Sequence, residues 1–304
     1  MIDRFHGMMA HLPTVFGLDG EIDEQATRAN IRRLLGNGII AVYCMGSSGE
    51  FFNLSPAEYR RVVRLFIEEA GRDVLKIVGA GWPCLSETVE TAAWLNGAGV
   101  DAILVMVPYL VPLNSVERVR CIREIASKCP ALGVIHYNTS YAPRVRFIAR
   151  DYASLLDVSN FWGAKHGTLN LQEWSEFRDL TPGLRHMPLD DWLVPTMKAG
   201  GHGAFSLLTS FSPRYALRFF EACESGNWNL AEAMEQEWKK FVDNVYLPLS
   251  RRGYSDIAVD KALIDCFGVL VAGSPRSPLM PVSFSDQRWA AKEIERERYF
   301  QNVH

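Results

Sequence analysis

Short apolar runs alternate with longer amphipathic runs along most of this chain. The short runs are rich in Val, Ile, Leu and Ala and show no polar face, which is typical of strands buried on both sides in a parallel sheet. They predict strands at residues 7–13, 39–45, 74–80, 102–107, 132–137, 161–165, 184–189 and 202–207.

The segments between these runs place apolar residues three and four positions apart, which is the period of an amphipathic helix. They predict helices at residues 23–35, 56–70, 86–98, 115–128, 148–156, 171–180 and 192–199. The second helix has the best-specified start, because Ser55 and Glu58 form a capping-box pattern around a proline. Ser86, followed by Glu87 and Glu90, looks similar at the next helix.

Eight strands, each followed by a helix, are the count of a (β/α)8 TIM barrel. An open doubly wound sheet alternates in the same way but rarely reaches eight units without a second domain. Residues 211–300 hold more helix than one unit requires, which indicates about three additional helices. We therefore predict an α/β fold: a (β/α)8 barrel at residues 1–225, with a C-terminal helical extension at residues 226–304 packed on it.

The composition is that of an ordinary soluble globular chain, with 304 residues, 48% hydrophobic and 22% charged. A net charge of −3 and a pI near 6.2 give no general attraction to nucleic acid or anionic membranes. Apolar stretches such as residues 100–107 are far shorter than the roughly 20 residues of a spanning helix. The N-terminal segment lacks the apolar core of a secretory signal. We expect a cytoplasmic protein without nucleic-acid or membrane partners.

The six cysteines are scattered, without the C-x-x-C spacing of metal or redox sites. Such isolated cysteines are best interpreted as small buried side chains in a reducing cytosol. The sequence also lacks an H-E-x-x-H motif, a phosphate-binding loop and a dinucleotide-binding glycine turn. We expect neither a metal site nor a cofactor.

Reactive side chains lie at the carboxyl ends of several predicted strands. In barrels of this class the carboxyl ends of the strands form the rim that carries the active site. We therefore expect these side chains to gather at one rim. They are Ser47 and Ser48 after the second strand, Tyr109 after the fourth, Tyr137 at the end of the fifth and Lys165 at the end of the sixth.

Lys165 is the most informative of these residues. It ends an apolar run, and lysines rarely end buried strands because removing water from an ammonium is costly. One interpretation is a surface lysine at a strand-to-helix turn. The other is an amine kept partly neutral by burial, which can attack a ketone and form an imine.

The accompanying residues favour the imine interpretation. Formation and collapse of the carbinolamine need a proton donor and acceptor, which the Tyr137 hydroxyl can supply. The turn Gly46-Ser47-Ser48-Gly49 can offer backbone N–H groups and two hydroxyls to the carboxylate of a 2-oxo acid. The protonated imine then withdraws electrons, so that the neighbouring carbon can be deprotonated to an enamine. A packing role for the tyrosine and an ordinary turn at the serines are the alternatives.

Six short motifs occur in these segments in a fixed order. The first is Gly46-Ser47-Ser48-Gly49-Glu50 followed by Leu54-Ser55. The others are Pro13 with Gly20-Glu21-Ile22-Asp23, Val107-Pro108-Tyr109, Tyr137-Asn138, Gly163-x-Lys165-x-x-Thr168, and Asp190-Asp191 with Gly200-Gly201-His202-Gly203. In order and spacing, across residues 6–280, they resemble the dihydrodipicolinate synthase/N-acetylneuraminate lyase family.

The resemblance implies a (β/α)8 barrel, a class I aldolase-type mechanism that needs no cofactor, and commonly a homotetramer. Lys165 falls on the Schiff-base lysine and Tyr137 on the catalytic tyrosine. Ser47 and Ser48 fall on the carboxylate-binding pair, with Ser47 at the position often assigned to the proton relay. The remaining expected substrate-binding residues lie in the matching segments and are Gly46, Gly49, Tyr109, Asn138 and Thr168.

Three positions depart from the synthase pattern. An arginine that normally holds a second carboxylate of the synthase substrate is replaced by Ala142, which disfavours lysine biosynthesis. Arg144 could substitute for it only if the loop follows a different path. A tyrosine often donated to a neighbouring subunit's site is replaced by Leu110. The residue after the lysine, often a glutamate, is His166, and strand alternation points it away from Lys165.

Other segments look like particular subfamilies. Residues 50–59, 108–110 and 251–254, with Lys261, look like 5-dehydro-4-deoxyglucarate dehydratases, although Ser47 stands where those enzymes often have glycine. The Met45-Gly46 step and residues 107–114 look like hydratase-aldolases that act on aryl-substituted pyruvates.

The sequence thus predicts a lyase that forms a Schiff base with a 2-oxo acid, most simply in aldol or retro-aldol cleavage with pyruvate as donor or product. The alternatives are a dehydratase of a deoxy-oxo sugar acid and a barrel that binds a 2-oxo acid without turnover. A metal-dependent aldolase is disfavoured because no ligand cluster has suitable spacing. We expect a homo-oligomer, a dimer or tetramer. Asp190 and Asp191 are expected to cap the helix at 191–199, and His202 to be a turn residue.

Overall fold

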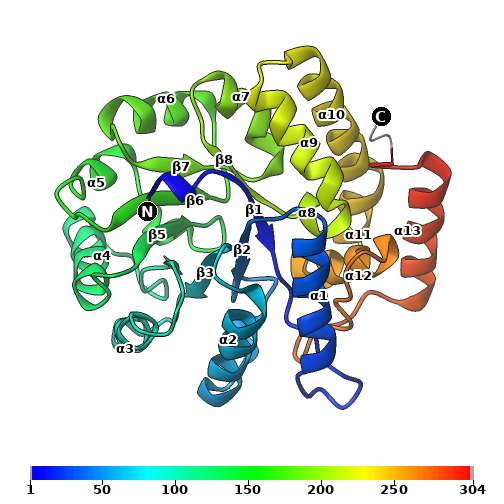
Figure 1. Cartoon of the computed structure of the whole chain (residues 1–304), viewed down its shortest axis with the longest axis horizontal. Coiled ribbons are helices and arrows are strands. Elements are labelled where there is room, and N and C mark those ends of the chain that lie inside the picture. The colour runs from blue at the N-terminus through cyan, green and yellow to red at the C-terminus, as the bar shows by residue number, and fades with distance from the viewer. Residues whose placement is uncertain (1, 302–304) are drawn as a thin grey trace. The chain divides into compact units, whose positions relative to one another are not determined.

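The computed structural model describes residues 2–301, and its strands form one eight-stranded sheet (Figure 1). All eight predicted strands are confirmed, with ends that differ by a few residues. They are β1 (Gly7–His11), β2 (Ala41–Cys44), β3 (Leu75–Ala80), β4 (Ala102–Val105), β5 (Gly133–Asn138), β6 (Phe161–His166), β7 (Arg185–Met187) and β8 (Gly203–Ser206).

The strand order is β7-β6-β5-β4-β3-β2-β1-β8, so neighbours in the chain are neighbours in the sheet. The strand pairs whose register is described are parallel. A parallel bridge between Leu189, just after β7, and Phe205 of β8 joins the two ends of this order. A parallel sheet closed in this way, with helices between its strands, is a (β/α)8 barrel, which confirms the predicted fold class.

The predicted helices are also present. These segments form helices because each has an apolar stripe that packs on the rest of the chain, and most begin at a side-chain cap. Ser55 and Glu58 form the predicted capping box at the start of the second helix. The helices are α1 (Glu24–Gly36), α2 (Pro56–Ala70), α3 (Leu85–Leu95), α4 (Ser115–Lys128), α5 (Ala149–Ala153), α6 (Leu171–Leu180), α7 (Leu193–Lys198), α8 (Leu208–Phe211), α9 (Pro213–Glu224), α10 (Trp228–Phe241), α11 (Leu247–Ser250), α12 (Asp256–Phe267) and α13 (Phe284–Glu297).

Two of the expected helix starts are wrong. Helix α3 begins at Leu85 after the N-cap Cys84, so Ser86 lies inside the first turn and is not its cap. Helix α7 has Trp192 as its N-cap, with no side-chain cap hydrogen bond, and Asp190 and Asp191 lie in the preceding 3₁₀ turn Asp190–Trp192. The short 3₁₀ turn moves the start of the helix to Leu193, so neither aspartate is its N-cap residue.

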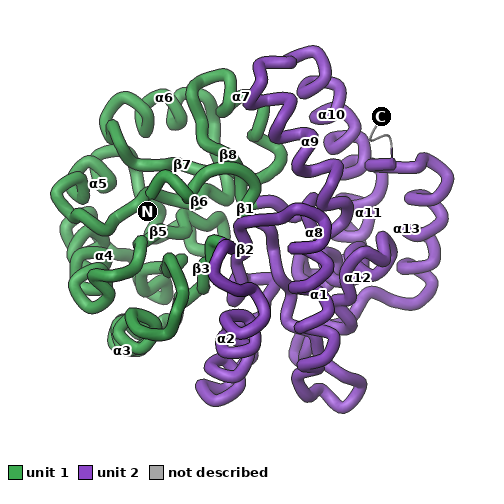
Figure 2. The backbone as a smooth tube through the Cα atoms, in the orientation of Figure 1, with its two compact units in different colours: residues 1–9, 75–205 green, residues 10–74, 206–304 purple. Residues whose placement is uncertain are grey.

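The chain forms two compact units (Figure 2). Unit 1 contains residues 1–9 and 75–205, and unit 2 contains residues 10–74 and 206–304. The predicted extension, residues 226–304, falls within unit 2. The proposed boundary at residue 225 stays a prediction.

Unit 1 has a layer of buried histidines between its strands and its outer helices. The layer consists of His136 on β5, His166 on β6 and His186 on β7, each at most 4% exposed. All three pack against Tyr152 of α5, and His166 and His186 also pack against Phe177 of α6. His166 therefore lies on the helix side of β6, as strand alternation predicted.

Hydrogen bonds fix which ring nitrogens of this layer carry protons. The Thr181 hydroxyl donates to the carbonyl of Phe177, so it accepts from His186 Nε2 at 2.8 Å. His186 Nδ1 is then an acceptor, and His166 Nε2 donates to it at 2.9 Å. His166 Nδ1 is left as an unprotonated acceptor that has no hydrogen-bond partner among residues 2–301.

The three imidazoles of this layer are neutral near pH 7. Burial lowers the pKa of His136 and of His186 to about 3, and it holds the pKa of His166 well below its ordinary value. The neighbouring imidazole of His186 lowers the pKa of His166 further, because two adjacent cations would repel each other.

Unit 2 combines the first two barrel helices with the C-terminal helices. Salt bridges between α1 and α2 join Arg28 and Arg32 to Glu69. An aromatic cluster of Phe211, Trp238, Phe241, Phe267 and Phe300 forms the core beside α8, α10 and α12.

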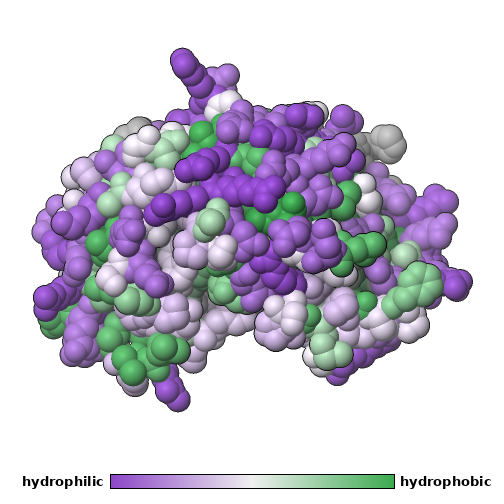
Figure 3. Space-filling model, turned by 90° about the horizontal axis from the view of Figure 1, so that it is seen from below, coloured by the Kyte–Doolittle hydropathy of each residue, from purple (hydrophilic) through white to green (hydrophobic). Residues whose placement is uncertain are grey.

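Apolar side chains also reach the surface, where Figure 3 shows hydrophobic groups among hydrophilic ones. In unit 1 they include Leu110, Val111 and Val116, which are 69%, 58% and 77% exposed. Among residues 2–301, no helix has both the length and the apolar character to cross a membrane.

Candidate active site

Lys165 and Tyr137 face each other on neighbouring strands of unit 1. They are register partners across the β5–β6 pair. Lys165 Nζ lies 4.3 Å from the centroid of the Tyr137 ring and 5.0 Å from the centroid of the Phe205 ring. The lysine is 4% exposed and the tyrosine 9%. The structure therefore brings the predicted amine and the predicted proton relay together, both largely buried.

A glycine two residues before the lysine makes this placement possible. Gly163 has φ +138, and a Cβ there would lie 2.0 Å from the carbonyl oxygen of Arg185 on β7. Only glycine lets β6 approach β7 this closely. The register of β5 against β6 also shifts between Val134 and Ile135. These two features fix which residue of β6 stands opposite Tyr137.

The side chain of Asn138 makes two hydrogen bonds to the loop that follows β5. Its Nδ2 donates to the carbonyl of Phe147 at 3.0 Å, and its Oδ1 accepts from the N–H of Phe147, also at 3.0 Å. This buried pair closes the loop at residues 139–147 onto the end of β5. The side chain therefore holds the loop in this structure, and its contact with substrate stays a prediction. Ala142 in the same loop is buried, and Arg144 is exposed.

The other predicted substrate residues of unit 1 lie in loops that follow the strands. Tyr109 follows β4 and is half-buried, and burial raises the pKa of its hydroxyl. Its neighbour Leu110 is 69% exposed. Thr168 is exposed, and its carbonyl accepts a hydrogen bond of 3.4 Å from Arg146 Nη2.

The turn at residues 46–49 follows β2 in unit 2 and has an unusual backbone. The residues on either side, Met45 and Glu50, have φ of 57 and 52, a left-handed conformation that is uncommon outside glycine. A Cβ on Gly49 would lie 3.1 Å from the backbone nitrogen of Met45. The turn is closed by Gly49 N–H to Gly46 O (3.1 Å) and anchored by Thr14 Oγ1 to Gly49 O (2.7 Å).

The turn leaves several donors available for an anion. The hydroxyl of Ser47 and the backbone N–H groups of Ser47 and Ser48 make no hydrogen bond within the described residues 2–301. Backbone N–H groups on a turn, together with a hydroxyl, are donors of the kind that bind anions. The carboxylate contact predicted for Ser47 and for the glycine-flanked turn therefore has the required groups.

Ser48 differs from Ser47, because its hydroxyl donates to Asp260 Oδ2 at 2.5 Å. The other oxygen of this carboxylate accepts from the Tyr246 hydroxyl at 2.8 Å. Sequence analysis missed both Asp260 and Tyr246, since they lie about two hundred residues along the chain and belong to no motif. No local signal in the sequence could have paired them with the serine.

A buried ion pair stands at the end of the same turn. Glu50 and Lys261 are both fully buried and form a salt bridge. Glu50 Oε2 also accepts from the N–H of Arg276 (3.0 Å) and from Asn53 Nδ2 (3.1 Å). Burial lowers the pKa of Lys261, and the Glu50 carboxylate opposes that shift. The motif glutamate therefore secures the turn to helix α12.

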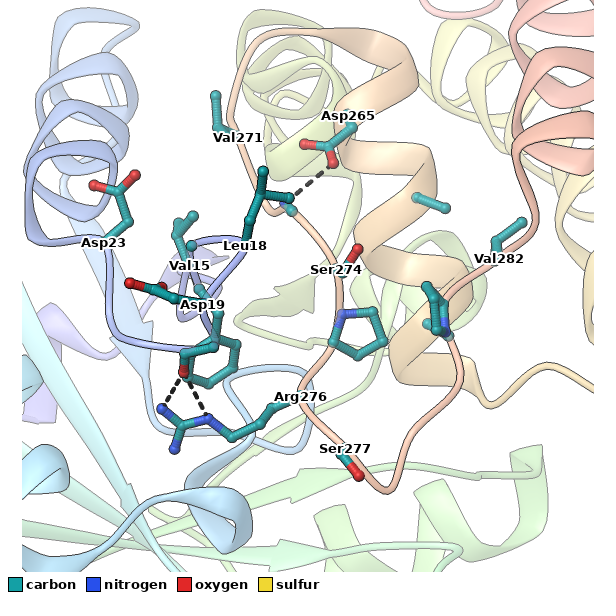
Figure 4. Close-up of a pocket in the computed structure, with 18 of the residues that line it drawn as sticks. Val15, Leu18, Asp19, Asp23, Asp265, Val271, Ser274, Arg276, Ser277 and Val282 are labelled. Carbon is teal, nitrogen blue, oxygen red and sulfur yellow. Dashed lines mark hydrogen bonds between the residues drawn. The ribbon is translucent and has the colours of Figure 1, made fainter.

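A cavity of about 610 Å³ lies elsewhere in unit 2 (Figure 4). The loop at residues 15–20, helix α12 and the loop at residues 271–282 line it, and Asp19, Asp23 and Asp265 stand at its wall. Arg276 donates to the carbonyl of Gly20 on its lower side. None of the predicted site residues lines this cavity, so we give it no part in catalysis.

The predicted site residues thus fall in two described groups. Unit 1 contains Lys165 with Tyr137, and the strand ends and loops that carry Asn138, Tyr109 and Thr168. Unit 2 contains the turn with Ser47 and Ser48. In the part of the chain that the structure describes, no group of three or more His, Cys, Asp or Glu side chains is arranged to hold a metal ion.

Comparison with known proteins adds to this geometry. Residues 4–297 match the model of the Dihydrodipicolinate synthetase family. A 4-hydroxy-tetrahydrodipicolinate synthase of Methanopyrus kandleri is 28% identical over 302 residues, which cover 96% of each chain. A probable 5-dehydro-4-deoxyglucarate dehydratase of Bacillus licheniformis is 26% identical over 286 residues, 91% of this chain and 89% of the relative.

Solved structures share the fold. YagE, a prophage protein of Escherichia coli K12 solved in complex with pyruvate, has a TM-score of 0.87 at 23% identity, covering 97% of this chain and 99% of its own. The sialic acid aldolase of Ruminococcus gnavus has a TM-score of 0.85 at 19% identity, with the same coverage of 97% and 99%. At these identities the structural likeness establishes the architecture.

Proposed function

The chain belongs to the dihydrodipicolinate synthetase family, and on this premise we propose that it is a lyase that forms a Schiff base between Lys165 and a 2-oxo acid. The observation that carries the proposal is the buried Lys165 amine, 4.3 Å from the ring of Tyr137 on the neighbouring strand. A buried lysine with a tyrosine as its neighbour supplies the nucleophile and the proton donor that imine formation requires.

The proposed reaction begins with attack of the neutral Lys165 amine on the keto carbon. Tyr137 donates a proton to the carbinolamine oxygen, which leaves as water, and the product is a protonated imine. The faces of the Tyr137 and Phe205 rings lie within 5.0 Å of Nζ and would stabilise this cation. Loss of a proton or cleavage of a bond next to the iminium carbon then gives the enamine.

The substrate carboxylate is assigned to the turn at residues 46–49. Its support is that the hydroxyl of Ser47 and the N–H groups of Ser47 and Ser48 make no hydrogen bond to any of residues 2–301. The turn follows β2, Tyr137 lies near the end of β5, and Lys165 lies near the end of β6. The assignment also follows the resemblance, in which Ser47 and Ser48 fall on the carboxylate-binding pair and Lys165 on the Schiff-base lysine. No cofactor or metal enters this scheme, so EDTA should leave the rate unchanged.

We favour aldol or retro-aldol chemistry with pyruvate as donor or product. YagE, which shares the fold, was solved with pyruvate. The position expected to bind a second carboxylate is the buried Ala142, and Arg144 in the same loop is exposed, which disfavours the dicarboxylate substrate of the synthases. Dehydration of a deoxy-oxo sugar acid through the same enamine is the second candidate, favoured by the likeness to the Bacillus dehydratase.

A panel of hydroxylated 2-oxo acids separates these reactions. Pyruvate release, followed by NADH oxidation through lactate dehydrogenase, would identify an aldolase. A product lighter by one water, without pyruvate, would identify a dehydratase. A thermal shift by 2-oxo acids without either product would identify a binding barrel. Lys165→Ala should abolish turnover, whereas Lys76→Met, which removes another buried strand lysine from its ion pair with Asp101, should retain it.

We further propose that the protein is a cytoplasmic homo-oligomer, a dimer or tetramer. The support is the group of exposed apolar side chains Leu110, Val111 and Val116, which association would remove from water. Light scattering coupled to size-exclusion chromatography measures the mass in solution. A monomeric mass at micromolar concentration would contradict this assignment.

A further inference from the structure

A residue of helix α12 determines the direction in which the Ser48 hydroxyl donates its hydrogen bond. A serine hydroxyl has one proton to donate, and here Ser48 gives it to Asp260 Oδ2 at 2.5 Å. Ser48 is half-buried, and Asp260 is 7% exposed. A hydroxyl that already donates to a carboxylate has no proton left for the carboxylate of a substrate. The hydroxyl of Ser47, one residue earlier, donates to no group among the described residues 2–301.

Asp260 is itself held by a second donor. The Tyr246 hydroxyl donates to Oδ1 at 2.8 Å, so both carboxylate oxygens act as acceptors. Tyr246 is the last residue of the π-helical segment Val242–Tyr246, between α10 and α11. A π-helical turn inserts extra residues into a helix and re-aims the side chains that follow, and such turns are frequent at functional sites. The local irregularity thus places the tyrosine on the aspartate.

Two consecutive residues of α12 secure the turn at residues 46–50. Asp260 holds Ser48, and Lys261 holds Glu50 through the buried ion pair. These contacts act on a stretch of backbone whose flanking residues, Met45 and Glu50, are in the left-handed conformation. Without the anchors, the turn can relax toward a more common conformation, and the free donors of Ser47 and Ser48 would change direction.

We propose that Asp260, held by Tyr246, is a positioning residue for the substrate's carboxylate, and this inference rests on the function proposed above. It turns the Ser48 proton away from the substrate and fixes the turn. The carboxylate is then bound by the Ser47 hydroxyl and the backbone N–H groups of Ser47 and Ser48. Asp260 acts through Ser48 and does not touch the reacting atoms.

The test measures the rate at which borohydride traps pyruvate on the protein as a function of pyruvate concentration. In Asp260→Asn the half-saturating pyruvate concentration should rise about tenfold, the order expected for loss of one hydrogen bond to a charged group. The maximal trapping rate should stay within about threefold, because Lys165 and Tyr137 are unchanged. Tyr246→Phe, which keeps the aspartate charge, should shift the half-saturating concentration in the same direction and less.

A double-mutant cycle separates positioning from direct charge repulsion. A repulsion between Asp260 and the substrate's carboxylate would act in any background. A positioning effect acts through the Ser48 hydroxyl and needs that group. In a Ser48→Ala protein, Asp260→Asn should therefore change the half-saturating pyruvate concentration by less than about twofold. Asp265→Asn is the matched control. It removes another partly buried carboxylate of α12, which accepts from Ala272 N and Gly273 N, and it should leave half-saturation unchanged.

The outcomes distinguish the two levels of the proposal. If the wild-type protein forms no adduct at any pyruvate concentration, the proposed function is wrong and this inference falls with it. If the wild type saturates but Asp260→Asn matches Asp265→Asn, the inference alone is wrong. Equal effects of Asp260→Asn with and without Ser48 would also overturn it. Circular dichroism and the urea midpoint of each variant establish that it is folded.

Discussion

Lowering the pH from 7.5 to 5.5 should destabilise the protein through its buried histidine layer. His136, His166 and His186 are neutral in the folded state, since burial lowers the pKa of His136 and His186 to about 3 and that of His166 well below the ordinary 6.5. In the unfolded chain they titrate near 6.5. Below that pH the histidines bind protons in the unfolded state but stay neutral in the folded state. Their contribution to the free energy of unfolding is therefore fully present above pH 6.5 and is lost as the pH falls toward 3.

The size of the effect follows from the shifts. One pH unit below the unfolded pKa, each histidine costs about 1.4 kcal/mol of unfolding free energy, and three cost about 4 kcal/mol. That is a large part of the roughly 5–15 kcal/mol that a folded domain has. His166 is the least able to accept a proton, because its Nδ1 has no acceptor among residues 2–301 and its neighbour His186 would be charged too.

Urea unfolding followed by circular dichroism at pH 7.5 and 5.5 measures the loss. His186→Gln removes one titrating group, so the difference between the two pH values should shrink by about 1.4 kcal/mol. Phe177→Leu is the matched control, because Phe177 stacks on the His186 ring in the same layer and does not titrate. It should lower stability equally at both pH values. A pH difference that His186→Gln leaves unchanged would refute the reasoning.

Three further predictions concern the site and its supports. Glu50→Gln leaves the fully buried Lys261 without its counter-charge and should cost about 3–5 kcal/mol in urea unfolding, while the double variant with Lys261→Met should regain most of it. A loss below about 1 kcal/mol in the single variant would contradict this. Gly163→Ala places a Cβ 2.0 Å from Arg185 O and should lower stability by at least about 2 kcal/mol and slow adduct formation, whereas Gly97→Ala, with open space around it, should do neither. Tyr137→Phe keeps the ring beside Lys165 but removes the hydroxyl, and it should lower turnover about 10²–10⁴-fold with little change in melting temperature. Unchanged turnover would exclude Tyr137 as the relay.

The barrel could be predicted from the sequence because its signal is local. Fully buried strands and amphipathic helices each leave a period in their own residues, so all eight strands were found with small errors at their ends. The pairing of Lys165 with Tyr137 also followed, since both lie at the ends of consecutive strands, and consecutive strands are neighbours in a barrel. The starts of α3 and α7 were predicted wrongly, because their N-cap residues, Cys84 and Trp192, are not typical helix caps.

The contacts that the sequence could not supply are long-range ones between side chains. Nothing near Ser48 in the sequence indicates a partner in α12, so the hydrogen bond of its hydroxyl to Asp260 was not predicted, and a contact of Ser48 with substrate stays a prediction. The hydrogen bonds by which the Asn138 amide closes a loop on Phe147 were not predictable either, and its contact with substrate stays a prediction. The orientation of His166 away from Lys165 was predictable from strand alternation, but its hydrogen bond to His186 on β7 was not.

The central claim is that Lys165 forms an imine with a 2-oxo acid, and borohydride trapping with pyruvate followed by peptide mass analysis tests it most directly. The account predicts a reduced adduct on the peptide that contains Lys165. The adduct should be absent in Lys165→Ala and retained in Lys76→Met, another lysine buried on a barrel strand. No adduct on the folded wild-type protein with pyruvate or longer 2-oxo acids, or an adduct that persists in Lys165→Ala, would contradict the account.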